Sequence, residues 1–306
     1  MQPSFINFMT GIIDYAGLFP PAGLDIATTL ANYADYMDGE SGWILGRCIL
    51  PADQLHQVGL HPGFGYSVIV SSELPEEELE QLSIFSKEHR RVEIVETRLP
   101  DTIDSLEACS DHLLHLKAKL NRAELQNVRI FLETGNLVAT AILASSLAAF
   151  NAQREGGKII SGAGCKLRCG GQAKEAFPTV AQVAEVIVIC RRQDIPIKFT
   201  AGIHHPLRHF SSDLHVMQHG FINIFAAALL SWACNLSIEQ IAACLDDESA
   251  QNFHFAKTGF SWKGHFISTG EIKRLRRRKV ISFGSCSFSE PVAGLRSLYL
   301  LDNSGD

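Results

Sequence analysis

The sequence predicts a (β/α)₈ barrel, and two observations carry this prediction. Short runs rich in β-branched and aromatic residues alternate with longer stretches of helical periodicity, which is typical of repeated βα units. Eight strand candidates with intervening helices match a closed barrel of this type in both number and length. The alternative that the same alternation allows is an open doubly wound sheet.

The expected strands and helices follow one another along the chain. The strands are expected at Gly11–Phe19, Gly42–Leu50, Tyr66–Ser71, Val92–Thr97, Val128–Glu133, Cys165–Cys169, Ile195–Ala201 and Gly220–Phe225. The helices are expected at Leu24–Asp38, Glu76–Arg90, Thr102–Arg122, Leu137–Ala152, Val180–Gln193 and Ser237–Leu245, with shorter segments at Ala52–Val58 and Leu207–His219. Acidic or Thr residues at the start of a helix and arginines in its last turn mark two of these helices most clearly, Glu76–Arg90 and Val180–Gln193.

The alternation stops near residue 250, where Gly, Ser and aromatic residues become mixed. We therefore expect a barrel over residues 1–250 and a C-terminal extension over residues 251–306 that packs on it. The basic run from Lys273 to Lys279 could bind phosphate groups, but a short run on an acidic chain favours a solvated helix face.

Composition limits the class of protein and its partners. The chain has 306 residues, of which 46% are hydrophobic, which is ample for a core. Its formal net charge of −6 provides no overall attraction to nucleic acid or to anionic membranes. We expect a small-molecule substrate, no nucleic-acid partner and no membrane association, and a homo-oligomer is possible on this composition.

The cysteines and the N-terminus indicate a cytoplasmic location. Eight cysteines are scattered through apolar segments and do not frame a small disulfide scaffold, so we interpret them as reduced. The N-terminus lacks the basic region and continuous apolar core of a signal peptide, and the apolar run Ile222 to Cys234 is too short to span a bilayer.

Polar residues gather near the predicted strand ends. In (β/α)₈ barrels, the chemistry takes place at the carboxyl ends of the strands. The polar residues expected there are Asp14, Tyr15, Arg47, Glu96, Arg98, Glu133, Lys166, Arg168, Lys198, His204, His205 and Asn223.

The alternation of faces along each strand decides which of these charges point inward. Apolar residues occupy one face of the strand that ends at Glu133, and Glu133 lies on the other. The same alternation sets Lys166 and Arg168 opposite an apolar face, and likewise Lys198, so all four should line the barrel mouth. They could form an internal ion-pair lattice with Glu96, but such lattices cost desolvation, which favours a ligand-handling site.

The two lysines suggest a specific chemistry. A lysine becomes nucleophilic when it is desolvated beside another cation, because both effects disfavour the ammonium form. Lys166, the "CGG" that follows it, the "TVAQVAEVI" helix and Lys198 in "IPIKFTAGI" together resemble class I aldolases similar to deoxyribose-phosphate aldolase. The resemblance covers about forty residues.

This resemblance implies a Schiff base on Lys166, with Lys198 perturbing its pKa. Glu133 or Glu96 would move protons, and no cofactor would be needed. Six of the other polar residues near the strand ends are expected to bind the substrate: Arg168, Arg47, Asp14, Tyr15, His204 and Asn223. The loop "AGIHHPLRH" lacks the Ser-Gly-Gly type of phosphate cradle and the fourth strand lacks the Asp-centred pattern of the aldolases, which disfavours a phosphorylated substrate.

Two other functions are open. His204, His205 and His209 could bind a divalent metal such as zinc in a lyase or hydrolase, although no acid accompanies them in a His-Glu-x-x-His arrangement. A barrel that binds a ligand without turnover is the third hypothesis.

Two further stretches could serve a site. The Gly and Ser residues around Cys286 in "FGSCSFSEP" can supply backbone donors to a thiolate, although a turn with a packed thiol is the interpretation we favour. The prolines and glycines of "DYAGLFPPAGL" predict a rigid turn, which would either hold Asp14 and Tyr15 at the site or simply connect the first strand to its helix.

Overall fold

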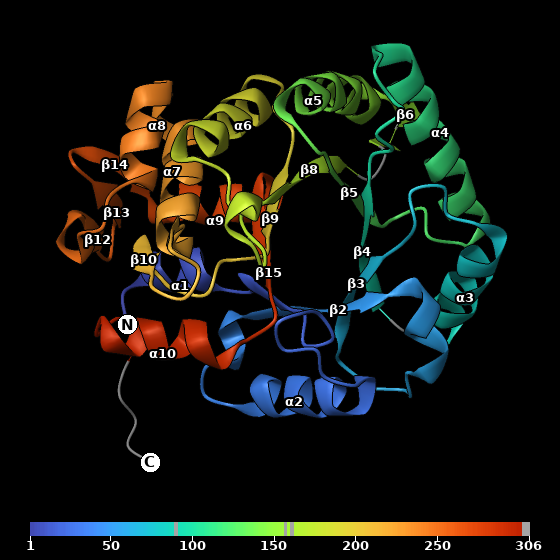
Figure 1. Ribbon diagram of the computed structural model, residues 1–306, viewed down its shortest axis with the longest axis horizontal. Helices are drawn as coiled ribbons and strands as arrows, with labels where there is room; N and C mark the ends of the chain where they lie inside the picture. Colours follow the sequence, from blue (N-terminus) through green and yellow to red (C-terminus); the bar gives the residue numbers. More distant parts are fainter. Residues whose placement is uncertain (89–90, 156–157, 160–161, 302–306) are drawn as a thin grey trace.

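The protein is a closed barrel of parallel strands surrounded by helices, as Figure 1 shows for the computed structural model. The structure describes residues 1–88, 91–155, 158–159 and 162–301. Among them, eight strands close in the order β1-β15-β9-β8-β5-β4-β3-β2. These strands are β1 (Ile13–Tyr15), β2 (Leu45–Pro51), β3 (Gly65–Ile69), β4 (Arg91–Arg98), β5 (Arg129–Glu133), β8 (Ala163–Arg168), β9 (Ile197–Thr200) and β15 (Val280–Ser285). The predicted fold class is confirmed.

Helices cover the outside of the barrel (Figure 1). They are α2 (Ile26–Asp38), α3 (Glu76–Lys87), α4 (Leu106–Arg122), α5 (Leu137–Ala152), α6 (Val180–Arg192), α7 (Phe221–Cys234) and α10 (Ser289–Ser297). The start of α6 illustrates how local sequence sets a boundary: Thr179 and Gln182 form a capping box that satisfies free backbone N–H groups. Short 3-10 turns are η1 (Gly42–Ile44), η2 (Ala52–Gln57), η3 (Lys174–Ala176) and η4 (Ala250–Asn252).

The eighth strand lies elsewhere than the sequence analysis predicts. Gly220–Phe225 is wrong as a strand, because its residues open helix α7, and the barrel is closed by β15. Helix α7 is apolar on every side: its Phe225 contacts Phe199 of β9, and its Phe221 stacks on Phe283 of β15. Periodicity does not distinguish a fully buried helix from a buried strand, so the apolar run was ambiguous. The barrel therefore continues to Ser285, within the segment expected as a C-terminal extension.

The residues between α7 and β15 form additional elements beside the barrel. They are α8 (Ile238–Leu245), a three-stranded antiparallel sheet of β12 (Phe253–Phe255), β13 (Gly259–Trp262) and β14 (His265–Ser268), and α9 (Thr269–Arg278). The N-terminal helix α1 (Pro3–Met9) packs beside α9, and Phe8 contacts Phe260 of the small sheet. No helix in the described part of the chain has the length and apolar character needed to cross a bilayer.

The segment Leu207–His219 is a hairpin and not the predicted helix. It contains β10 (His209–Ser211) and β11 (Val216–Gln218), which pair antiparallel around a turn where Leu214 donates its backbone N–H to Ser211. Turn formation by Ser and Asp outweighs the helical spacing of the histidines. A second small antiparallel pair consists of β6 (Arg154–Glu155) and β7 (Lys158–Ile159).

The outward and inward faces of the strands bury different sets of side chains. Outward residues such as Val95, Ile130 and Cys165 belong to the main core between strands and helices. Inside the barrel, Ile94, Phe131 and Ile281 form a separate apolar cluster. Gly164 makes room for this cluster, since a Cβ there would lie 2.5 Å from the Phe131 ring. The inner polar residues discussed below share the barrel interior with this cluster: Glu96, for example, is the register partner of Phe131 on the neighbouring strand.

Candidate active site

A lattice of five charged side chains lies inside the barrel, beside the apolar cluster. Its members come from five strands and are Asp14 of β1, Glu96 of β4, Glu133 of β5, Lys166 of β8 and Lys198 of β9. Lys166 and Lys198 are register partners on neighbouring strands, and Lys166 is also the partner of Glu133. The predicted inward orientation of these residues is what brings them together.

Lys198 lies at the closed end of this lattice. Its Nζ is 2.5 Å from Asp14 Oδ2 and 2.5 Å from Glu96 Oε1. Two hydroxyl groups donate hydrogen bonds to these carboxylates: Ser282 donates to Asp14, and Ser67 donates to Glu96. Every member of this group is fully buried, so Lys198 and its two carboxylates are paired away from solvent. Lys166 and Arg47 supply further positive charge to Glu96 and Asp14.

Lys166 lies at the open end. Its Nζ is 2.9 Å from Glu96 Oε2 and 3.3 Å from Glu133 Oε2, while Arg168 Nε lies 2.8 Å from Glu133 Oε1. The exposed fraction of the side chains rises in steps, from 0% for Lys198 to 8% for Lys166, 15% for Glu133 and 51% for Arg168. A small molecule that approaches from solvent would therefore meet Arg168 and Glu133 first and Lys166 next.

The lattice favours the charged forms of its three carboxylates and of Lys166. Burial alone would raise the pKa of Asp14, Glu96 and Glu133, but the neighbouring lysines and, for Asp14 and Glu133, an arginine lower each pKa below its ordinary value. Burial likewise disfavours the charged form of Lys166, yet Glu96 and Glu133 outweigh it and raise the pKa of that amine. Lys166 is therefore an ammonium at neutral pH, which differs from the nucleophilic amine that the resemblance implies.

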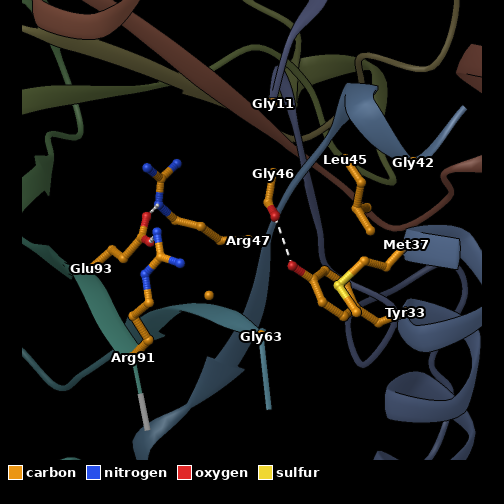
Figure 2. Close-up of a pocket in the computed structure, with 11 residues that line it drawn as sticks. Gly11, Tyr33, Met37, Gly42, Leu45, Gly46, Arg47, Gly63, Arg91 and Glu93 are labelled. Carbon is orange, nitrogen blue, oxygen red and sulfur yellow. Dashed lines mark hydrogen bonds and ion pairs between the residues drawn. The ribbon is translucent and has the colours of Figure 1, made fainter. Parts of the chain in front are cut away.

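Arg47 reaches the lattice from the opposite end of the barrel. Its backbone N–H donates to Asp14 Oδ1 at 2.8 Å, and its guanidinium lies 2.9 Å from Glu93. Figure 2 shows Arg47 and Arg91 both directed at Glu93, beside a cavity of about 270 Å³ lined by residues near the amino ends of β1–β4. Arg47 thus supports Asp14 from the amino-terminal side, away from the open end at Arg168.

Two predicted substrate-binding residues are occupied in structural contacts. Asn223, in the first turn of α7, donates to the carbonyl oxygens of Cys244 and Asp247 and accepts from the backbone N–H of Arg208. Tyr15 points outward from β1, where its ring packs edge-on against Tyr36 of α2. Their side chains are buried away from the barrel interior, so the structure does not bring them to the lattice.

The histidines form a different arrangement from the predicted metal cluster. His205 and His209 have ring centroids 4.1 Å apart, but His204 uses its two ring nitrogens elsewhere, Nδ1 toward Glu290 and Nε2 toward Cys286. Within the described residues, no group of three or more His, Cys, Asp or Glu side chains is arranged to hold a metal ion.

Three contributors to these contacts were missed in the sequence. Ser67 alternates inward on a predicted strand, but an isolated serine gives no signal of its own. Ser282 lies on the strand that was overlooked, although the run "VISFGS" carries the expected β-branched and aromatic residues. Glu290, four residues after Cys286, could have been noticed as an acid near a thiol.

Comparisons of the chain with protein-family models, with curated proteins and with solved structures found no match.

Proposed function

We propose that the protein is an enzyme that cleaves or forms a carbon–carbon bond beside a carbonyl group of a small substrate, as aldolases do. The observation that carries this proposal is the position of Lys166, whose ammonium lies within 3.3 Å of two carboxylates where the lattice reaches solvent. Charged groups in a partly dry pocket can stabilise the charge that develops during such a reaction.

The proposed reaction uses Lys166 and Glu133 together. Glu133 accepts the proton of a β-hydroxyl group on the substrate, the carbon–carbon bond breaks, and its electron pair moves to the carbonyl oxygen as an enolate. The Lys166 ammonium stabilises that oxygen, and the exposed guanidinium of Arg168 attracts an anionic substituent of the substrate. Glu133 then gives its proton to the enolate carbon, which restores the enzyme.

A Schiff base on Lys166 is the alternative route to the same products. It requires Lys166 to lose its proton before it attacks the carbonyl, and the raised pKa of this amine opposes that loss. The two carboxylates within 3.3 Å of the Lys166 amine therefore favour the charged route over the covalent one.

The experiment is a screen of small β-hydroxy ketones and β-hydroxy acids for cleavage, with a parallel arm that contains borohydride. We expect turnover that Lys166→Met abolishes and that Lys174→Met, which alters an exposed lysine of η3, leaves unchanged. A substrate fragment reduced onto Lys166 would replace the charged route by the Schiff base. Ligand-dependent thermal stabilisation without turnover on any compound would overturn the proposal in favour of a non-catalytic barrel.

A further inference from the structure

A second group of reactive side chains lies at the carboxyl ends of two neighbouring strands. Cys286 follows the last residue of β15, and His204 follows β9 by four residues. Cys286 Sγ lies 3.8 Å from His204 Nε2, and His204 Nδ1 lies 2.7 Å from Glu290 Oε2. We call Cys286, His204 and Glu290 the thiol relay.

The side chains of the thiol relay are arranged as nucleophilic catalysis requires. A thiol faces one ring nitrogen of a histidine, and a carboxylate holds the other ring nitrogen. Because Glu290 and Cys286 contact opposite sides of the imidazole, the three donors do not converge on one point as metal ligands would. A carboxylate at Nδ1 keeps Nε2 directed at the thiol and stabilises the imidazolium.

The surroundings favour charge separation within the thiol relay. Burial lowers the pKa of His204, but the contact with Cys286 and the charge of Glu290 outweigh this effect and raise it. Helix α10 begins three residues after Cys286, and the positive end of a helix stabilises a nearby anion. Cys286 and His204 are half-buried and Glu290 is exposed, so an external compound can reach them.

We propose that the thiol relay is a second catalytic site, in which Cys286 attacks the carbonyl carbon of an activated acyl compound such as a thioester or an ester. The sulfur–carbon bond forms as the alcohol or thiol leaves, and His204 returns the thiol proton to that leaving group. Water then attacks the acyl-cysteine while His204 accepts its proton, which releases the carboxylic acid and restores the thiol. This inference does not depend on the reaction proposed at Lys166.

An acyl substrate fits the thiol relay better than alkylation or redox exchange. Acyl transfer needs a group that first removes a proton and later delivers one, which is the role of an imidazole oriented by a carboxylate. In this scheme Cys286 and His204 are the catalytic residues, and Glu290 is a positioning residue that acts through His204.

The protein provides its own reference thiol for the test. Cys234 is also half-buried, but its Sγ lies 3.2 Å from the carbonyl oxygen of Phe266 and has no imidazole partner among the described contacts. We expect iodoacetamide at neutral pH to alkylate Cys286 about 10-fold faster or more than Cys234, since the His204 imidazole 3.8 Å from the Cys286 sulfur can accept the thiol proton as the thiol reacts. Replacing His204 by Gln should remove most of that advantage.

The catalytic step is tested with p-nitrophenyl acetate on the full chain. We expect a burst of about one p-nitrophenolate per chain, with an acetyl group on Cys286 detected by peptide mass spectrometry. Cys286→Ala should abolish the burst, His204→Gln should slow it about 100-fold or more, and Cys234→Ala should leave it unchanged. Glu290→Gln should lower kcat with little change in KM, and Glu290→Asp should restore part of it. Equal alkylation of the two cysteines, or a burst that survives Cys286→Ala, would overturn the proposal.

Discussion

The lattice around Lys198 and the thiol relay around His204 place charged groups in opposite environments. The lattice is buried at its closed end, where Lys198 pairs with Asp14 and Glu96 away from solvent. The thiol relay lies at the rim of the barrel, and its carboxylate Glu290 is 59% exposed. Removal of one partner from a buried ion pair is therefore costly although the pair itself is out of reach of a substrate, whereas rim charges contribute little stability and are accessible from solvent.

Lys166 lies between the buried end of the lattice and the exposed rim. It belongs to the lattice through Glu96, yet it lies one step from solvent through Glu133 and Arg168. For this reason the lyase reaction that we propose uses Lys166 and not Lys198.

The largest effect expected from this comparison is on stability at Lys198. Lys198→Met should lower the free energy of unfolding by about 3–5 kcal/mol, because it removes the fully buried cation that Asp14 and Glu96 share. Urea unfolding measures this change, and Arg168→Met is the control with an expected loss of about 0–1 kcal/mol. If Lys198→Met does not fold, the additional substitutions Asp14→Asn and Glu96→Gln should restore folding, since they remove the negative charges that Lys198 partners. Equal losses for Lys198→Met and Arg168→Met would contradict the distinction.

Acid should destabilise the protein through the lattice carboxylates. The pKa of Glu133 is lowered in the folded state, so the unfolded state takes up its proton first, near its ordinary pKa of about 4.3. Glu133 therefore contributes stability above that pH, and the contribution disappears as the pH falls through the folded pKa. Asp14 and Glu96 act in the same direction.

Unfolding of the wild type and of Glu133→Gln between pH 3 and pH 7 measures this effect. The variant should be less stable at pH 7, and the two curves should converge as the pH falls. Parallel curves across the range would mean that Glu133 carries no stabilising ion pair.

A smaller loss of stability is expected at Gly46, where the backbone lies close to the Asp14 side chain of the lattice. A Cβ at Gly46 would lie 2.3 Å from Asp14 Oδ1, so Gly46→Ala should push Asp14 aside and cost about 1–3 kcal/mol. Gly270→Ala, at a helical position whose Cβ would meet nothing within 4 Å, is the matched control and should cause no comparable loss. A Gly46→Ala protein as stable as the control would show that Asp14 can shift freely.

The smallest stability effect belongs to the thiol relay. Glu290→Gln should change the free energy of unfolding by about 1 kcal/mol or less, because the pair that Glu290 forms with His204 is exposed to solvent on one side. The same variant should still slow the alkylation of Cys286, which separates the role of Glu290 in orienting His204 from any role in folding. A loss comparable to that of Lys198→Met would place Glu290 among the structural charges.

The sequence predicted the inward direction of several lattice residues, but it did not predict the contacts of the thiol relay. Alternation along strands is a local property, so the inward direction of Glu133, Lys166 and Lys198 followed from their neighbours in the chain. The contact of Cys286 with His204 spans 82 positions and depends on β9 and β15 being adjacent in the barrel. With β15 unrecognised, this adjacency could not be deduced.

The sequence alone determined the repeated βα architecture and the identity of the charges that line the barrel interior, because hydrophobic periodicity and side-chain alternation act over a few residues. The tertiary structure decided which apolar run closes the barrel, whether the Lys166 amine is charged, and which partners His204 meets. These outcomes depend on contacts between distant segments and on the burial they create. Local sequence does not specify the dielectric environment or the counter-ions of a side chain.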